Sequence, residues 1–152
     1  MSDEKVEVVR GYYEAVKGVF EAYWEDPGSA ADALETGEVP AVAVEMLRYM
    51  HPNVEWKTAL TGTTYRGYNG LARGFDQTVD AAQNYGIEIQ EVSELGGDKV
   101  LAVVKAAMRG RATDIDVNAG IYVVVTVRNG LITRMDEYLE RADALEAAGL
   151  SE

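Results

Sequence analysis

The sequence predicts an α+β domain over residues 1–152, in which helices cover one face of a curved, antiparallel or mixed sheet. Two observations support this prediction. Apolar residues in the first half recur at steps of three and four, the spacing of amphipathic helices. From residue 87 onward, short alternating segments separated by tight turns indicate a meander of strands. Three helices followed by such a meander would form a cone, with a cavity between helices and sheet.

The first helix is expected to carry an apolar stripe formed by Val6, Val9, Tyr13, Val16, Phe20 and Trp24. Asp26-Pro27-Gly28 should end this helix, because the residue before a proline avoids helical angles. Pro40 suits the first turn of a second helix, whose inward residues would include Met46 and Met50.

A break at His51-Pro52-Asn53 precedes "VEWKTAL", a predicted strand in which Val54 and Trp56 share a face. A third helix is expected to begin near Asn69 and to end at Gly86 as a left-handed cap.

The remaining segments are predicted to be strands, joined by recognisable turns, and a short helix that ends near Gly149. Gly96-Gly97-Asp98 separates "IEIQEVSEL" from "KVLAVVKAAMRGRA", and a break near residues 114–118 leads into "AGIYVVVTV". Asn129-Gly130 indicates a type I′ hairpin turn into "LITRMDEYLE".

Residues 58–75, "TALTGTTYRGYNGLARGF", contain four glycines where the chain should pass from a strand into a helix. A phosphate-binding loop would place a lysine after its glycines, and no lysine follows here. We therefore expect Gly62, Gly67 and Gly70 to serve the conformation of the backbone.

Composition excludes several classes of function. The chain has no cysteine and one histidine, which argues against disulfides, thiolate catalysis and histidine-rich metal sites. A net charge of −12 disfavours nucleic acid and anionic membranes as partners. The acidic N-terminus lacks the apolar region of a signal peptide, and no run approaches the roughly 20 apolar residues of a membrane span. We expect a cytoplasmic, bacterial-type protein that needs no cofactor.

Several segments together carry a resemblance to a known family: "NVEW" at 53–56, "YRGYNGL" at 65–71, "GDKVLAVV" at 97–104, "VTVRNGLITRMDEYLERADAL" at 125–145 and "EAAGL" near the end. In this order and spacing they resemble SnoaL-like members of the nuclear transport factor 2-like superfamily. Ketosteroid isomerases, limonene epoxide hydrolases and polyketide cyclases share that cystatin-like cone. The resemblance implies that the "Y-x-G" segment turns the chain at the rim of the cone.

Glu137 is the leading candidate for a catalytic residue. If Met135 points into the cone, alternation along the strand places Glu137 and Leu139 there too, and Arg134, Asp136 and Tyr138 on the other side. The resemblance places a pocket carboxylate of the epoxide hydrolases just before a tyrosine, where Glu137 stands here. A carboxylate in an apolar cavity has a raised pKa and can act as a general acid or base. The alternatives are a solvated glutamate at the rim, or a register shifted by one residue that turns Asp136 inward.

The resemblance also shows which familiar catalytic residues are missing. The Arg-x-Asp pair of the epoxide hydrolases would fall near Val104 and Ala106, and the base of the isomerases would fall near Trp56. The acidic donor of the isomerases aligns with Tyr122, which could donate a hydrogen bond to a substrate oxygen or could pack in the core.

Two classes of function remain open from the sequence. One is a cofactor-independent isomerase, cyclase or hydrolase that acts on an apolar, oxygenated small molecule by proton transfer, with Glu137 and Tyr122 as catalytic residues. The other is a non-catalytic ligand-binding or dimerisation module. In either class, the substrate-binding residues are expected to be Trp56, Phe75, Met108, Met135, Leu139 and Tyr13.

A homodimer is also expected. The argument is a contiguous apolar surface on the sheet face opposite the helices, assigned to Leu101, Val103, Ile121, Val123, Val125 and Val127.

Overall fold

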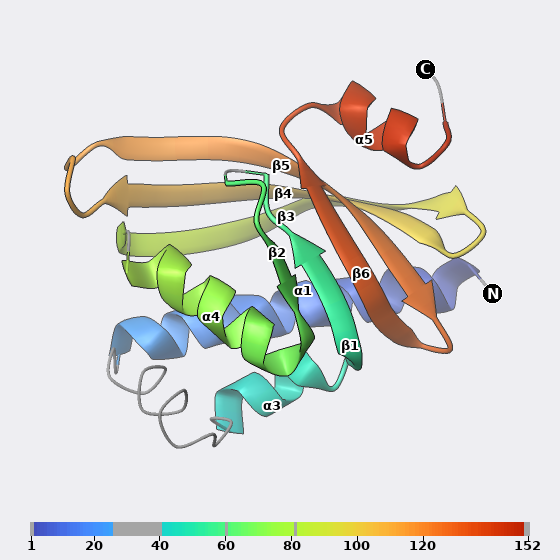
Figure 1. Cartoon of the computed structure of the whole chain (residues 1–152), viewed down its shortest axis with the longest axis horizontal. Helices are drawn as coiled ribbons and strands as arrows, with labels where there is room; N and C mark the ends of the chain where they lie inside the picture. Colours follow the sequence, from blue (N-terminus) through green and yellow to red (C-terminus); the bar gives the residue numbers. More distant parts are fainter. Residues whose placement is uncertain (1, 26–40, 60, 81, 151–152) are drawn as a thin grey trace.

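A computed structural model describes residues 2–25, 41–59, 61–80 and 82–150. The elements in chain order are α1 (Ser2–Glu25), α3 (Ala41–Leu47), β1 (Met50–Lys57), β2 (Thr64–Arg66), α4 (Gly67–Asp80), β3 (Ala82–Gly96), β4 (Lys99–Gly110), β5 (Asp116–Arg128), β6 (Leu131–Tyr138) and α5 (Arg141–Ala147). Figure 1 shows α1, α3 and α4 on one face of the sheet and α5 on the other. We call these the inner and the outer face.

The sheet is mixed and has the strand order β2-β1-β6-β5-β4-β3. β1 and β6 run parallel, whereas the other neighbouring strands run antiparallel. The α+β architecture is therefore confirmed, with the difference that α5 covers part of the outer face. The expected helix end at Asp26-Pro27-Gly28 and the expected start at Pro40 lie outside the described residues, so the count of three N-terminal helices stays a prediction.

The core lies between α1 and the inner face of the sheet. Val9 of α1, Val54 of β1 and Ile132 of β6 have no exposed surface, and they belong to one cluster that also takes in β3, β4 and β5. The apolar stripe expected on the first helix is thus the packing face of α1 as far as Phe20, the last stripe residue whose side chain is described.

Two element boundaries differ from expectation. β1 begins at Met50, before the break that His51-Pro52-Asn53 was expected to make. The β1–β6 register is interrupted between Met50 and Glu55, and Pro52 is exposed. Proline can occupy this irregular stretch because no ladder hydrogen bond is lost there. Gly86 is not a helix cap: α4 ends at Asp80, and Gly86 pairs with Ala107 inside β3.

The glycines singled out in the sequence serve the backbone in two ways: some adopt a positive φ, and one allows a close approach of the chain. Asn129 and Gly130 both have positive φ, at 53° and 77°, which confirms the type I′ hairpin. Gly62 and Gly67 also have positive φ, at 70° and 69°, so their predicted backbone role is confirmed. Gly70 has no positive φ, and a Cβ there would instead lie 3.2 Å from the backbone of Tyr65.

The apolar surface used to argue for a dimer is divided between the two faces. Val123 pairs directly with Ala102 and Leu101 with Val124, so alternation turns Val123 inward while Leu101 faces outward. The residues that lie in the inner cluster are Ile121, Val123, Val125 and Val127. On the outer face, Leu101 and Val103 are buried in a cluster with Ala144 of α5. The predicted apolar surface is therefore not formed as one face, and it no longer supports a homodimer, which stays a prediction.

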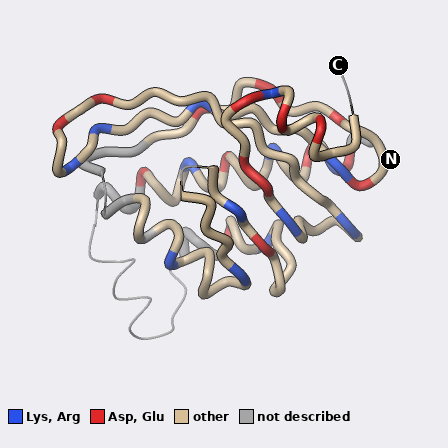
Figure 2. Tube along the Cα trace, turned by 45° about the horizontal axis from the view of Figure 1, so that its top comes forward, with Lys and Arg blue, Asp and Glu red and all other residues tan. Residues whose placement is uncertain are grey.

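The surface reflects the acidic composition. Figure 2 shows acidic residues along the traced chain with Lys and Arg interspersed among them. At the end of the β4–β5 hairpin, Arg109 contacts Asp114 at 2.9 Å and Asp116 at 3.6 Å, so these charges pair with each other. None of the helices in the described part of the chain is both long and apolar enough to span a membrane.

Candidate functional site

A cleft lies between α1, α4 and the inner face of the sheet. It contains about 480 Å³ of empty space, including the part that is open to solvent. Its lining is formed by Tyr12, Tyr13, Val16, Phe20, Trp56, Phe75, Thr78, Ile87, Val104, Ile121, Val123, Met135 and Glu137. Among these described residues only Glu137 is an acid, and none is Lys, Arg or His. The cleft therefore presents one carboxyl group within an apolar and aromatic surface.

The carboxyl group of Glu137 is held by two N–H donors. The indole Nε1 of Trp56 donates to Oε2 at 2.8 Å, and the backbone N–H of Ala59 donates to Oε1 at 3.2 Å. Each carboxylate oxygen thus accepts one hydrogen bond and retains a lone pair for another partner. The register explains the contact, since Trp56 is the Cα partner of Met135 on the adjacent parallel strand, two residues before Glu137.

Opposing effects set the pKa of Glu137. Burial raises the pKa above the ordinary value of 4.5, whereas the hydrogen bonds from Trp56 and Ala59 lower it. Desolvation is the largest of these effects, so the net shift is upward. A glutamate with a raised pKa can hold a proton at a higher pH than an exposed one, which is the requirement for general acid–base chemistry.

Aromatic rings form much of the cleft wall. The ring of Trp56 lies 5.3 Å from that of Phe75 and 5.4 Å from that of Tyr65, tilted by 34° and 37°. Phe75 also meets Phe20 of α1 edge to face at 5.4 Å. These contacts join β1, β2, α4 and α1 around the indole, which restricts its orientation.

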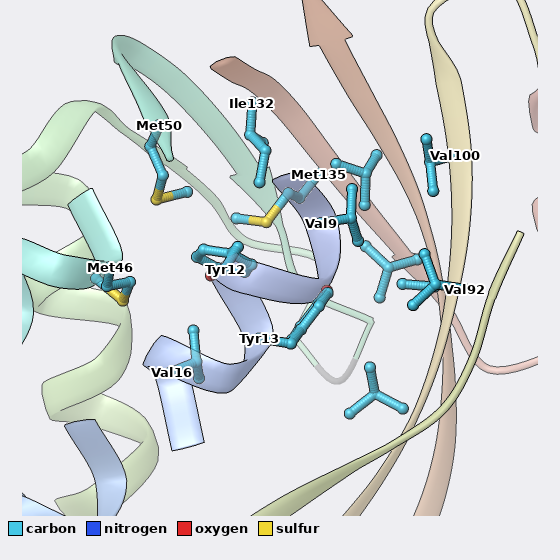
Figure 3. Close-up of a cluster of buried hydrophobic side chains, with 14 of the residues drawn as sticks. Val9, Tyr12, Tyr13, Val16, Met46, Met50, Val92, Val100, Ile132 and Met135 are labelled. Carbon is cyan, nitrogen blue, oxygen red and sulfur yellow. The ribbon is translucent and has the colours of Figure 1, made fainter. Parts of the chain in front are cut away.

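The first helix supplies the opposite wall. Figure 3 shows Tyr12 and Tyr13 extending from α1 toward the strands, with Met135 of β6 across from them. The two tyrosine rings meet edge to face at 4.8 Å, and both residues are almost fully buried. This packing places two phenol groups in the lining of an otherwise apolar wall.

Five of the predicted site residues lie in the cleft lining: Glu137, Trp56, Phe75, Met135 and Tyr13. The register inferred from the hairpin also holds on the other side of β6. Arg134 pairs there with Asp136 at 2.7 Å and with Glu55 at 3.2 Å. Asp136 is therefore outside the cleft, whereas Glu137 is half-buried and lies in the cleft lining.

Three predicted site residues lie elsewhere. Leu139 follows the end of β6 and is 48% exposed, because the strand alternation stops at Tyr138. Met108 lies on the same face of β4 as Val104, but it pairs with Val117 beyond the cleft.

Tyr122 is the most consequential correction. Its Cα partners are Val103 and Tyr138, and it packs in the outer cluster with Leu101. The guanidinium of Arg141 lies 5.6 Å from the centre of its ring. Tyr122 is therefore on the opposite side of the sheet from Glu137 and cannot donate to a ligand in the cleft.

Sequence reasoning missed the group that orients Glu137. Trp56 was expected only as an apolar wall, although a tryptophan on a strand next to a pocket carboxylate is a signal for an N–H donor. The backbone N–H of Ala59 carries no side-chain signal at all. Val104, one of the two positions near which the Arg-x-Asp pair of the epoxide hydrolases would fall, lies in the cleft lining. Its apolar side chain cannot replace either member of that pair.

A metal site is not formed by the described residues: they contain no group of three or more His, Cys, Asp or Glu side chains placed to hold an ion. One carboxylate with two N–H donors offers a metal ion too few oxygen ligands.

Comparison with known proteins agrees with the resemblance inferred from sequence. Residues 28–135 match the family model of the SnoaL-like domain. Comparison with curated proteins finds no match.

Solved structures with this fold include proteins described as enzymes and a ligand complex. A protein from Jannaschia sp. CCS1 described as a SnoaL-like polyketide cyclase is 12% identical, with a TM-score of 0.63 over 90% of this chain and 85% of that one. An M. tuberculosis LEH-like epoxide hydrolase is 13% identical, with a TM-score of 0.59 over 95% and 89%. A protein with a ketosteroid isomerase-like fold from Catenulispora acidiphila, in complex with trimethylamine, is 16% identical, with a TM-score of 0.56 over 80% and 92%. At these identities the likeness shows the fold alone.

Proposed function

Because the chain belongs to the SnoaL-like domain family, we propose that its cleft binds an apolar, oxygenated small molecule and that Glu137 exchanges a proton with it. The observation that carries this proposal is the setting of Glu137, a carboxyl group at the wall of an apolar cleft with N–H groups as its hydrogen-bond partners. Relatives described as a cyclase and an epoxide hydrolase support a small-molecule substrate.

The charge balance of the cleft limits the ligand. The described lining has no cationic side chain that could neutralise a carboxylate or phosphate, and an ionised Glu137 would repel such groups. A neutral ligand with an oxygen atom is compatible with both the protonated and the ionised form of Glu137. Protonated Glu137 can donate a hydrogen bond to that oxygen, and ionised Glu137 can accept a proton from an adjacent acidic carbon.

The reaction class that follows is proton transfer next to a carbonyl group. The ionised carboxylate of Glu137 takes a proton from the carbon, and the electron pair of the broken C–H bond moves into the carbonyl group to give an enolate. The protonated carboxyl group then returns the proton to the same or another carbon. The step is redox-neutral and uses no group beyond the ligand and Glu137.

A non-catalytic binding role is the second candidate. The position of Tyr122 on the outer face favours it, because the cleft then lacks the oxyanion donor that sequence comparison suggested. Val104 in the lining points the same way, since an apolar side chain cannot act on a substrate.

Deuterium exchange distinguishes the two candidates. A panel of small cyclic ketones in deuterated buffer would be incubated with the protein, and NMR would measure deuterium incorporation next to the carbonyl. We expect incorporation above the buffer rate with the native protein and with Tyr122→Phe, and none above it with Glu137→Gln. Equal rates for the native protein and Glu137→Gln would contradict catalysis by Glu137 and leave the binding role.

A further inference from the structure

The backbone of α4 lies directly against the indole of Trp56 at Gly74. A Cβ atom built at Gly74 would lie 3.0 Å from Cε3 of Trp56 and closer still to Cζ3, inside any ordinary carbon contact. It would also lie 3.1 Å from Cδ2 of Tyr65. A larger residue at 74 would therefore force the indole to move.

The backbone itself does not require glycine at this position. Gly74 is inside a helix and has no positive φ, so alanine could adopt the same dihedral angles. Glycine in a helix interior destabilises the helix relative to alanine, because it loses more conformational freedom on folding. The close approach of Trp56 is the reason the structure gives for tolerating this cost.

The indole has little room to yield. Its ring packs against those of Tyr65 and Phe75, and its N–H donates a hydrogen bond to Glu137. Tyr65 is fixed in turn by a hydrogen bond from its hydroxyl group to Gln77 of α4. A displacement that relieves a contact at residue 74 therefore disturbs the N–H of Trp56 that reaches the carboxylate.

We infer that Gly74 is a positioning residue for this site: by letting α4 lie against Trp56, it holds the indole N–H on the carboxylate of Glu137. The inference rests on the proposed function only in treating Glu137 as the residue that exchanges a proton with the ligand. The hydrogen bond itself does not depend on which ligand the cleft binds.

The consequence for Glu137 has a definite sign. The hydrogen bond from Trp56 lowers the pKa of Glu137 against the larger effect of burial, so displacing the indole raises that pKa further. The other titratable side chains of the described cleft lining are Tyr12 and Tyr13. Asp136 and Arg134 pair with each other on the outer face, away from Glu137.

The test uses the indole N–H signals of the protein. The chain has two tryptophans, so two indole signals are expected in a ¹⁵N–¹H spectrum, and Trp56→Phe identifies the one from Trp56. In the native protein this signal should shift with pH as Glu137 titrates. In Gly74→Ala the pH-dependent shift should be lost, and the pKa of Glu137 measured by ¹³C NMR should be higher than in the native protein.

Gly18→Ala is the matched control. Gly18 also lies inside a helix, but a Cβ there meets nothing within 4 Å. This variant should leave both the indole titration and the pKa of Glu137 unchanged.

A double variant separates the indole contact from a general effect on folding. If Gly74→Ala acts through Trp56, then adding it to Trp56→Phe should not raise the pKa of Glu137 above that of Trp56→Phe alone. If Gly74→Ala alone fails to fold, the smaller ring in the double variant should restore folding. An indole signal that titrates normally in Gly74→Ala, or a double variant that stays unfolded, would overturn the inference.

These readouts need neither ligand nor turnover. A ketone panel that shows no exchange, together with the expected indole behaviour, would contradict the proposed function and leave the role of Gly74 intact.

Discussion

The indole N–H of Trp56 donates to the carboxylate of Glu137 at 2.8 Å, joining residues 81 positions apart in sequence. The parallel pairing of β1 with β6 brings them together, because Trp56 is the Cα partner of Met135. Trp56 stands near the position of the catalytic base in the isomerases. Here its side chain instead orients Glu137, the only carboxyl group in the described cleft lining.

Removing the indole donor should raise the pKa of Glu137. Trp56→Phe retains a ring in the wall but removes the N–H that lowers this pKa. The ¹³C titration of Glu137 should move to higher pH than in the native protein. Tyr122→Phe is the control, since that ring packs on the outer face of the sheet and should leave the pKa of Glu137 unchanged. A lower pKa in Trp56→Phe would contradict the prediction that loss of the indole donor dominates the change at Glu137.

Glu137 should make stability fall as pH rises. The folded protein binds the proton of Glu137 more tightly than the unfolded chain does, because burial raises the pKa in the folded state. Raising the pH from about 4.5 through the folded pKa therefore lowers the free energy of unfolding. The pKa values of Glu91 and Asp98 are lowered, so these residues act in the opposite direction.

The variant Glu137→Gln isolates this effect, since Glu91 and Asp98 are present in both proteins. Urea unfolding across the pH range should show the native protein losing stability relative to Glu137→Gln as pH rises from about 4.5. A difference that grows in the other direction would mean that the folded state favours the ionised carboxylate.

Met135 should contribute strongly to stability and Leu139 should not. Met135 is 2% exposed and lies in the inner cluster, whereas Leu139 is 48% exposed. Met135→Ala should lower the free energy of unfolding by about 2–5 kcal/mol. Leu139→Ala should change it by less than about 0.5 kcal/mol. Similar losses in the two urea titrations would show that the alternation of β6 continues past Tyr138.

Ligand binding should be reported by Trp56 and should not depend on Tyr122. In a Trp24→Phe background, a small cyclic ketone that binds by calorimetry should change the fluorescence of Trp56, because its ring lines the cleft. Tyr122→Phe should leave this change intact, since Tyr122 lies on the outer face. Loss of binding in Tyr122→Phe would contradict the assignment of the two faces.

A homodimer remains a prediction from the family resemblance. Leu101 and Val103 are already covered within one chain, so the apolar face alone no longer requires a partner. Sedimentation at micromolar concentration should give twice the mass of the chain. A monomeric mass would end this prediction.

The sequence predicted well those features that depend on local patterns. Asn129-Gly130 specified a hairpin, and alternation from Met135 then placed Glu137 inward and Asp136 outward. The assignment of Tyr122 failed because it rested on an alignment with the acidic donor of the isomerases, whereas the strand pairing turns Val123 inward and Tyr122 outward.

The contacts between distant parts of the chain could not be predicted from the sequence, because they form only when the elements pack together. The N–H of Ala59 reaches Glu137 through the course of the chain after β1, and no side-chain pattern encodes that path. Gly74 stood in a stretch rich in glycines, but its close contact with Trp56 exists only once α4 packs against β1.

The central claim is that Glu137 is a half-buried carboxyl group in the cleft wall that holds its proton more tightly than an exposed glutamate. A ¹³C NMR titration of the carboxyl groups, assigned with Glu137→Gln, tests this claim most directly. We expect the pKa of Glu137 to lie above the ordinary value of 4.5. A pKa at or below that value would contradict proton exchange by Glu137 and leave the cleft as a binding site only.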